Sequence, residues 1–351
     1  MKANFKLKQI LSLLLCMILA LFLTNCNDEP TKPPLELIPK GKGLYVINEG
    51  TYGMGNASLY FVNLEDSNTA TDLFKAANNR PLGDIFQSMV LINNNAWLIV
   101  NNSSKIEVIS TKDSKSIGTI KGLKSPRYAS EVLPNKVYVT DLYSDAISIV
   151  DAITLTKTGE IKCQGWTEEM ILFQNKVWVT NHNSHYLYVI NPNTDKISDS
   201  IKLAYGGSSL LSDKAGKIWV LCSGDITKNK TGGLFCINPN TLSIEKQILF
   251  NSAAFNPVKL KQNKANDTLY YINQGLFCMT KSADYMPTLP FITQPSNASF
   301  YGLTINPVNG NILVADAVDF VSRGNLFVYS PTGNLLKSYK VGIVPGEFMW
   351  W

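Results

Sequence analysis

The sequence predicts an all-β protein, a seven-bladed β-propeller closed by a C-terminal strand that joins the first blade. Three observations predict this fold. A unit of about 40 residues recurs along residues 43–351. Each unit contains runs in which apolar and polar side chains alternate, which is the period of strands with one buried face. The last residues, 345–351, form one more strand candidate than the preceding unit needs.

The repeat is clearest in two neighbouring units. Lys136–Asp141 recurs 40 residues later as Lys176–Asn181, and these runs are followed by the second runs Ala146–Asp151 and Tyr186–Asn191. β-Branched and aromatic residues fill these runs, which favours strands. The expected first strands of the seven units begin near Leu44, Trp97, Val137, Val177, Ile218, Leu269 and Ile312.

A short strand candidate precedes every unit except the first. These candidates cover residues 85–91, 128–133, 169–173, 208–211, 257–260 and 302–305. The run at 345–351 would supply the strand that the first unit lacks, and the ring would then close without an exposed sheet edge. An open solenoid is the alternative, and it does not need this permuted end.

Residues 1–25 are expected to be a lipoprotein signal peptide. Three lysines precede an apolar run over residues 10–23, which is too short to cross a bilayer core of roughly 30 Å. The run ends in the tetrapeptide LTNC, which resembles a bacterial lipobox and predicts lipidation of Cys26. An uncleaved membrane anchor is the alternative.

Residues 26–42 are expected to form a lipidated tether. Three prolines among residues 30–34 favour a semi-extended linker without a core. The acidic pair Asp28-Glu29 resembles the export signal of surface lipoproteins in Bacteroidetes. The predicted location is therefore the outer membrane, with the domain held by the lipid on Cys26 and facing the cell exterior.

Composition excludes several classes of protein. Hydrophobic residues make up 45% and charged residues 17% of the chain, which is not typical of disordered, collagen-like or coiled-coil proteins. The formal charge of +5 falls when the three signal-peptide lysines are removed, since 29 basic residues then face 27 acidic ones. No block of Lys or Arg remains, so we expect no nucleic-acid partner.

Four cysteines remain in the body of the chain: Cys163, Cys222, Cys236 and Cys278. No pair has the CxxC spacing of a zinc site, and no metal site is predicted. A Cys222–Cys236 disulfide and two buried free thiols are both compatible with this spacing.

The repeats resemble YVTN-type (YncE-like) propeller repeats. The opening motifs GLYVINEG at 43–50, GNASL at 55–59 and NRPLGDIFQSM at 79–89 are similar to those of the DUF5074/BtuG-like surface lipoproteins of Bacteroidetes. The resemblance implies capture of a corrinoid (vitamin B12 or an analogue) and its delivery to a TonB-dependent, BtuB-like outer-membrane transporter. The corrinoid would be cargo, with no cofactor required and no catalysis.

Propellers carry function on the loops of one face around the central channel. We expect that face to present a rim of aromatic and amide side chains with few charges, which suits a large, flat ligand with many amide groups. Packing between blades is the alternative role for each aromatic residue. The candidate ligand-binding residues are Glu49, Tyr52, Met54, Asn56, Arg80, Asp84, Gln87, Arg127, Tyr128, Tyr143, Trp166, His182, His185, Tyr186, Tyr205 and Arg323.

Three further functions compete with corrinoid capture. A ferric siderophore or haem would be an alternative cargo, and the propeller could instead be an interaction scaffold with a flat face. A metal-dependent, lactonase-like hydrolase would need Asp84, Asp141, Asn181 and Asp316 to converge at the channel. No G-x-S-x-G or H-E-x-x-H motif occurs, and the sequence therefore offers no positive sign of an enzyme. His182 and His185 are either metal ligands or exposed loop residues.

Overall fold

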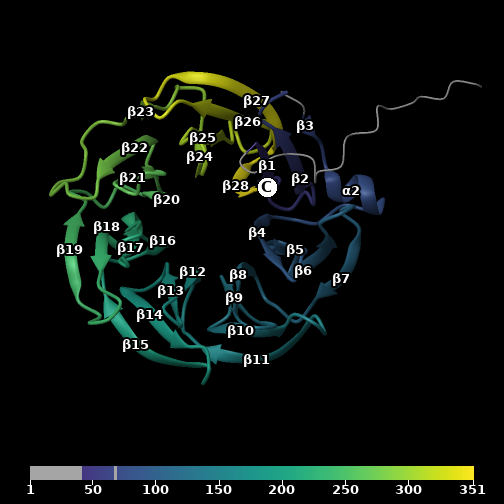
Figure 1. Cartoon of the computed structure of the whole chain (residues 1–351), viewed down its shortest axis with the longest axis horizontal. Coiled ribbons are helices and arrows are strands. Elements are labelled where there is room, and N and C mark those ends of the chain that lie inside the picture. Colours follow the sequence, from purple (N-terminus) through teal and green to yellow (C-terminus); the bar gives the residue numbers. More distant parts are fainter. Residues whose placement is uncertain (1–41, 67–68) are drawn as a thin grey trace, which may run out of the picture. The chain divides into compact units, whose positions relative to one another are not determined.

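The computed structural model describes residues 42–66 and 69–351. Within them the chain forms seven four-stranded antiparallel sheets, arranged as the blades of a ring (Figure 1). The predicted seven-bladed propeller is thus confirmed. The expected signal peptide, Cys26 and nearly all of the expected tether lie outside the described residues. None of the helices in the described ranges is long and apolar enough to span a membrane.

Each blade runs from an inner strand at the channel to an outer strand at the rim. Blade one contains β28 (Pro345–Trp350), β1 (Gly43–Asn48), β2 (Ser58–Asn63) and β3 (Thr69–Ala70), and blade two contains β4 (Phe86–Ile92), β5 (Asn95–Val100), β6 (Lys105–Ser110) and β7 (Ser116–Ile120). Blade three contains β8 (Pro126–Leu133), β9 (Lys136–Asp141), β10 (Ala146–Asp151) and β11 (Thr156–Lys162), and blade four contains β12 (Thr167–Phe173), β13 (Lys176–Asn181), β14 (Tyr186–Asn191) and β15 (Lys196–Lys202). Blade five contains β16 (Gly207–Ser212), β17 (Ile218–Cys222), β18 (Gly233–Ile237) and β19 (Ile244–Leu249), blade six contains β20 (Val258–Gln262), β21 (Thr268–Ile272), β22 (Gly275–Thr280) and β23 (Ile292–Thr293), and blade seven contains β24 (Phe300–Ile305), β25 (Ile312–Asp316), β26 (Arg323–Tyr329) and β27 (Leu335–Ile343).

Short helical segments complete the described elements. The helix α2 (Leu73–Asn78) follows the two-residue outer strand of blade one and buries Phe74 completely. Two 3₁₀ turns, η2 (Asn101–Ser103) and η3 (Ile226–Lys228), lie in the loops of blades two and five.

Blade one is assembled from both ends of the chain. The C-terminal strand β28 pairs antiparallel with β1, with Val46 opposite Phe348 and Leu44 opposite Trp350. The amide of Trp351 also donates to the carbonyl of Gly43 at 3.1 Å. This pairing confirms the predicted closure, which leaves β1 with no open edge. All described residues belong to one compact unit, and a chain of residues 35–351 contains every strand of the closed ring.

The core lies between neighbouring blades, and in six of the seven blades the same repeat position carries a large aromatic residue. The second strands β1, β5, β9, β13, β17 and β21 carry the large buried residues Tyr45, Trp97, Tyr138, Trp178, Trp219 and Tyr270. Trp178, for example, packs in one cluster with Val220 and Phe235 of blade five. Truncating such a residue to Ala costs about 3–5 kcal/mol, and the aromatic period is therefore a determinant of the fold.

The four cysteines of the described residues are free thiols. Cys222 lies opposite Gly233 in the β17–β18 ladder, and Cys236 lies opposite Trp219. The two thiols are therefore not paired across the ladder, and of the two predicted alternatives the structure has the unbridged one. Burial raises the pKa of both thiols, which keeps them protonated.

Every inner strand contains a β-bulge near the end that meets the loops of one face. The register of pairing with the second strand shifts between Phe86 and Ser88 in β4, and at the equivalent place in β8, β12, β16, β20, β24 and β28. A bulge adds an unpaired residue and redirects a side chain. The unpaired residues of these bulges are Gln87, Arg127, Tyr128, Glu168, Glu169, Ser208, Lys259, Leu260, Tyr301 and Gly346.

Candidate functional site

A cavity of about 220 Å³ lies where the bulged strand ends meet at the mouth of the channel. Blades two to seven and the segment that follows β1 in blade one contribute to its wall, so the cavity exists only because the ring is closed. Its lining residues are Glu49, Gln87, Arg127, Tyr128, Trp166, Glu168, Glu169, His182, Ser208, Ser209, Asn256, Val258, Lys259 and Tyr301.

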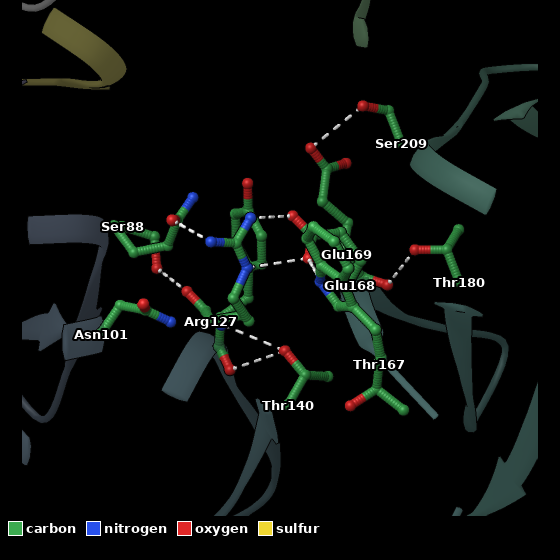
Figure 2. Close-up of polar contacts among 12 residues, drawn as sticks. Ser88, Asn101, Arg127, Thr140, Thr167, Glu168, Glu169, Thr180 and Ser209 are labelled. Carbon is green, nitrogen blue, oxygen red and sulfur yellow. Dashed lines mark hydrogen bonds and ion pairs between the residues drawn. The ribbon is translucent and has the colours of Figure 1, made fainter. Parts of the chain in front are cut away.

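Arg127 of β8 connects three blades at this mouth. Its Nε donates to Glu168 Oε2 at 2.8 Å and its Nη2 to Glu168 Oε1 at 2.6 Å, while Nη1 donates to Gln87 of β4. Figure 2 shows the guanidinium facing the Glu168 carboxylate, and also shows Ser88 donating to the Arg127 carbonyl. This two-point geometry holds the guanidinium in one orientation. Three of the five N–H donors of Arg127 are engaged in these contacts.

Trp166 and His182 form an aromatic pair beside this arginine. Their ring centroids are 4.3 Å apart, and the guanidinium carbon of Arg127 lies 5.3 Å from the Trp166 ring centroid. The indole N–H of Trp166 donates to Glu168. Burial lowers the pKa of His182 below its ordinary value, so the imidazole is neutral at pH 7. A rigid, uncharged aromatic surface therefore lies next to a fixed cation.

The other side of the mouth holds a second set of ionic contacts. Lys259 Nζ of blade six lies 2.5 Å from Glu347 Oε1 of β28, and the Tyr301 hydroxyl donates to Glu49 Oε2 at 3.1 Å. Burial opposes the charge of Lys259, but the carboxylate of Glu347 raises its pKa above the usual value. Gly346 makes room for this group, because a Cβ there would lie 2.6 Å from Glu49 Oε1.

Glu169 points into the channel beside this cluster. It accepts a hydrogen bond from Ser209 Oγ at 3.2 Å (Figure 2) and another from the Leu210 amide at 3.1 Å. Burial raises its pKa to about 7, and this carboxyl is therefore partly protonated at neutral pH. The expectation of a mouth with few charges is wrong. Charged residues of four blades converge here. Those of blades three, four and six come from the bulges of their inner strands, and blade one adds Glu49 and Glu347.

Six of the sixteen predicted residues line this cavity: Glu49, Gln87, Arg127, Tyr128, Trp166 and His182. All six lie in equivalent places of the repeat. They stand at or beside the start of an inner strand or directly after the second strand of a blade, which are the positions nearest the channel.

Asp84 and Asn56 hold loops together instead. Asp84 Oδ2 accepts from the Gly53 amide at 2.9 Å and from Asn102 Nδ2 at 2.5 Å, and this links the loops of blades one and two. Asn56 Oδ1 accepts from the Thr51 amide at 2.8 Å within its own loop. Both contacts shape the face without lining the cavity.

The two other predicted arginines lie away from the mouth. Arg80 pairs with the buried carboxylate of Glu107 at 2.6 Å and lies 4.8 Å from the Phe74 ring centroid. Arg323 Nε donates to the Val341 carbonyl at 3.0 Å. These contacts join neighbouring structural elements and leave neither guanidinium at the channel.

His185, Tyr205 and Tyr186 lie farther out, between blades four and five. The rings of His185 and Tyr205 meet edge to face at 5.1 Å, and Lys228 Nζ donates to the Tyr205 hydroxyl at 2.6 Å. Tyr186 packs against Tyr188 at 6.3 Å. The two histidines thus occupy different environments, which does not support a shared metal site.

Tyr52, Met54 and Tyr143 extend from the loops into solvent, with exposed fractions of 74%, 70% and 70%. They lie on loops that join the second and third strands of their blades, at the bulged end of the inner strands. Other large apolar residues exposed on loops of this face are Ile226, Phe320 and Val321. The face around the mouth therefore carries an interrupted apolar rim.

The residues proposed for a lactonase-like metal site do not converge. Asp141 accepts from the amides of Ser125, Tyr143 and Ser144 within its own blade, and Asp316 does the same in blade seven. Each is a turn-stabilising residue at the end of a second strand. Among the described residues, no group of three or more His, Cys, Asp or Glu side chains is placed to hold a metal ion.

The sequence predictions missed four charged residues of this cluster: Glu168, Glu169, Lys259 and Glu347. All four residues lie among the first three residues of an inner strand, which is one position of the repeat. An alternating strand pattern predicts apolar or exposed side chains there, and recurring charged residues were therefore the available signal. An alignment of the seven units with one another would have revealed these charged residues at the start of the inner strands.

Comparison with protein families and solved structures agrees with the fold. The family model described as Domain of unknown function (DUF5074) matches residues 42–342. No curated protein matches the chain.

Among solved structures, a quinonprotein alcohol dehydrogenase-like protein from Bacteroides thetaiotaomicron VPI-5482 is 17% identical, with a TM-score of 0.69 over 88% of this chain and 78% of that one. A protein from Bacteroides fragilis NCTC 9343, provisionally described as a 6-phosphogluconolactonase, is 13% identical, with a TM-score of 0.67 over 88% and 97%. Similarity at this level of identity shows the propeller fold alone.

Proposed function

The chain belongs to the DUF5074 family, and we propose that it is a non-catalytic, cell-surface lipoprotein that captures a corrinoid on the channel face. It then passes the corrinoid to a TonB-dependent, BtuB-like transporter in the outer membrane. The single observation that carries this proposal is the rigid cluster of Arg127, Trp166, Glu168 and His182 at the channel mouth, surrounded by an exposed apolar rim.

The size of the cavity defines how such a ligand would bind. About 220 Å³ is below the roughly 300–1,000 Å³ typical of pockets that enclose a whole ligand. A corrin macrocycle would therefore lie flat across the mouth, on Tyr52, Met54 and Tyr143, and insert one amide-bearing arm into the cavity. Aromatic side chains provide large contact area at a small entropic cost.

The charges of the cavity favour a neutral ligand with hydrogen-bonding groups. Its two lining cations are already paired, Arg127 with Glu168 and Lys259 with Glu347. An anionic ferric complex would have to compete with these carboxylates for a cation. Amide groups, in contrast, can bond to Ser208, Ser209 and Asn256 without separating an ion pair.

The path of β1 relates the proposed tether to this face. The strand starts at Gly43, opposite Asn63, and ends at Asn48 beside the cavity residue Glu49. The chain thus enters the propeller at the face opposite the mouth. Residues 26–42 can reach at most about 60 Å when extended. A tether of this reach would allow the mouth to turn toward a transporter in the same membrane, which raises the effective concentration of the two partners.

Calorimetric titration of residues 35–351 with cyanocobalamin tests the proposal. We expect saturable one-to-one binding that is lost in the variant Trp166→Ala and retained in Tyr188→Ala, a tyrosine outside the cavity. Absence of binding at cyanocobalamin concentrations of about 1 mM, which corresponds to a free energy near −4 kcal/mol, would contradict corrinoid capture. Equal binding by both variants would show that the mouth is not the site.

A further inference from the structure

Blade six is irregular at its outer edge. Its outer strand β23 has two residues, whereas β19 of the preceding blade has six. Blade one also has a two-residue outer strand, but there α2 packs against β2 and buries Phe74. In blade six the segment 281–291 contains neither helix nor strand. A cavity of about 360 Å³ lies between this segment and blade five.

The cavity has aromatic walls. The rings of Tyr271 and Phe277 are stacked, with centroids 5.5 Å apart and planes inclined by 9°. Phe250 meets Tyr271 edge to face at 5.9 Å, and Phe255 packs against Phe250 at 5.8 Å. The lining residues include no charged side chain; they are Leu249, Phe250, Asn251, Phe255, Tyr271, Asn273, Phe277, Tyr285, Met286, Pro287 and Thr288. Such walls suit a planar, uncharged group.

The Tyr271 hydroxyl in this cavity has a weak partner. The residue is 1% exposed, and its hydroxyl lies 3.9 Å from Met286 Sδ. A thioether is a poor acceptor, and a buried donor without a good acceptor is destabilising. Burial also raises the pKa of Tyr271, so the hydroxyl keeps its proton and is available to a better acceptor.

The segment that covers the cavity presents apolar side chains to water. Tyr285, which lines the cavity, is 83% exposed, and Leu289 is 79% exposed. Exposed aromatic residues at the entrance of a hollow are typical of ligand sites. The cavity shares no lining residue with the channel mouth.

We propose that this cavity is a second binding site, which takes a small, uncharged, planar aromatic molecule of one or two fused rings with a hydrogen-bond acceptor. The rings would lie against Phe277 and Phe250, and the acceptor would receive the Tyr271 hydroxyl in place of the Met286 sulfur. The volume is at the lower end of ligand pockets, about 300–1,000 Å³, and selects fused rings over a macrocycle. The site does not depend on corrinoid capture.

Two isosteric probes test this site, quinoline with a ring-nitrogen acceptor and naphthalene without one. Binding to residues 35–351 is followed by saturation-transfer NMR at pH 8, where quinoline is neutral. We expect a quinoline dissociation constant of roughly 1 mM or below. Tyr271→Phe should weaken quinoline about 3- to 10-fold, the effect of one hydrogen bond, and leave naphthalene unchanged. The matched control Tyr188→Phe, a tyrosine of blade four that lines neither cavity, should alter neither.

A filled cavity gives the decisive comparison. Met286→Trp should abolish binding of both probes while the unfolding midpoint in urea stays near that of the wild type. If that variant unfolds, Thr288→Trp, at an exposed lining position, replaces it. The proposal is overturned if the wild type shows no saturable binding, if a folded Trp variant still binds quinoline as the wild type does, or if Tyr271→Phe affects both probes equally.

Discussion

Removing the carboxylate of Glu168 should destabilise the propeller strongly, although the residue lies at the channel mouth and outside the apolar core. The side chains of Arg127 and Glu168 are 14% and 9% exposed, and two hydrogen bonds of 2.6 and 2.8 Å join them. The variant Glu168→Ala leaves a buried guanidinium with Gln87 as its neutral partner, and the Trp166 indole loses its acceptor.

The expected loss is about 3–5 kcal/mol in the free energy of unfolding, since removal of one partner leaves an uncompensated buried charge. The matched control is Glu160→Ala, which removes a carboxylate of β11 from a pair with Lys157 at 3.1 Å. That pair is more exposed, with side-chain fractions of 54% and 29%, and its loss should cost about 0–1 kcal/mol. The double variant Arg127→Ala/Glu168→Ala should recover about 1–3 kcal/mol of the loss, because neither charge is then unpaired.

Urea unfolding measures these changes, followed by tryptophan fluorescence and by far-ultraviolet circular dichroism. Coincidence of the two transitions supports a two-state treatment. If Glu168→Ala and Glu160→Ala lose the same free energy, the argument that the mouth is a buried ionic centre is refuted. If the free energy lost by the double variant, relative to the wild type, equals the sum of the losses of the two single variants, the two residues act independently.

Three other predictions concern the carboxyl of Glu169, the apolar rim and the lipid. The pKa of Glu169 is about 7 in the folded chain and about 4.3 when unfolded. Between these two values the folded state binds one more proton than the unfolded state. The free energy of unfolding therefore falls as pH rises from about 4.5 to 7, by up to about 3 kcal/mol. Glu169→Gln should abolish this part of the pH dependence of urea unfolding, and an unchanged profile would contradict the assignment. Replacing the three aromatic residues Tyr52, Tyr143 and Trp166 together by Ala should abolish cyanocobalamin binding in calorimetry and keep the β-sheet spectrum; unchanged affinity would place the ligand elsewhere. Cys26→Ala should end incorporation of labelled palmitate, and labelling at the wild-type level would disprove lipidation at this residue.

The fold could be predicted because each unit repeats the same local chemistry. The strands β9 and β13 start at Lys136 and Lys176, as the 40-residue spacing predicts. The inner strand β12 starts at Thr167, two residues before its predicted start at Glu169. A repeat that cannot bury its apolar face alone must stack on its neighbours, and the extra strand at the C-terminus then determines how the stack closes.

The site could be predicted only in part because it depends on the bulges. An alternating pattern assigns successive side chains to opposite faces, but a bulge shifts this assignment by one residue. Glu168 and Glu169 both lie in the bulge of β12, where side chains no longer alternate between the two faces of the sheet. Arg80 and Arg323 are predicted to lie at the mouth because of their positions in loops. In the structure Arg80 pairs with the buried carboxylate of Glu107, and Arg323 donates to the Val341 carbonyl.

Closure of the ring and formation of the site are one event in this molecule. Glu347 comes from the strand that closes blade one, and its partner Lys259 lies 88 residues earlier in blade six. Loss of the β1–β28 pairing would therefore remove a carboxylate from the mouth and leave Lys259 buried without it. A ligand that binds only the assembled mouth would in turn stabilise the closed ring by mass action. The C-terminal strand thus links the stability of the propeller to the occupancy of its channel face.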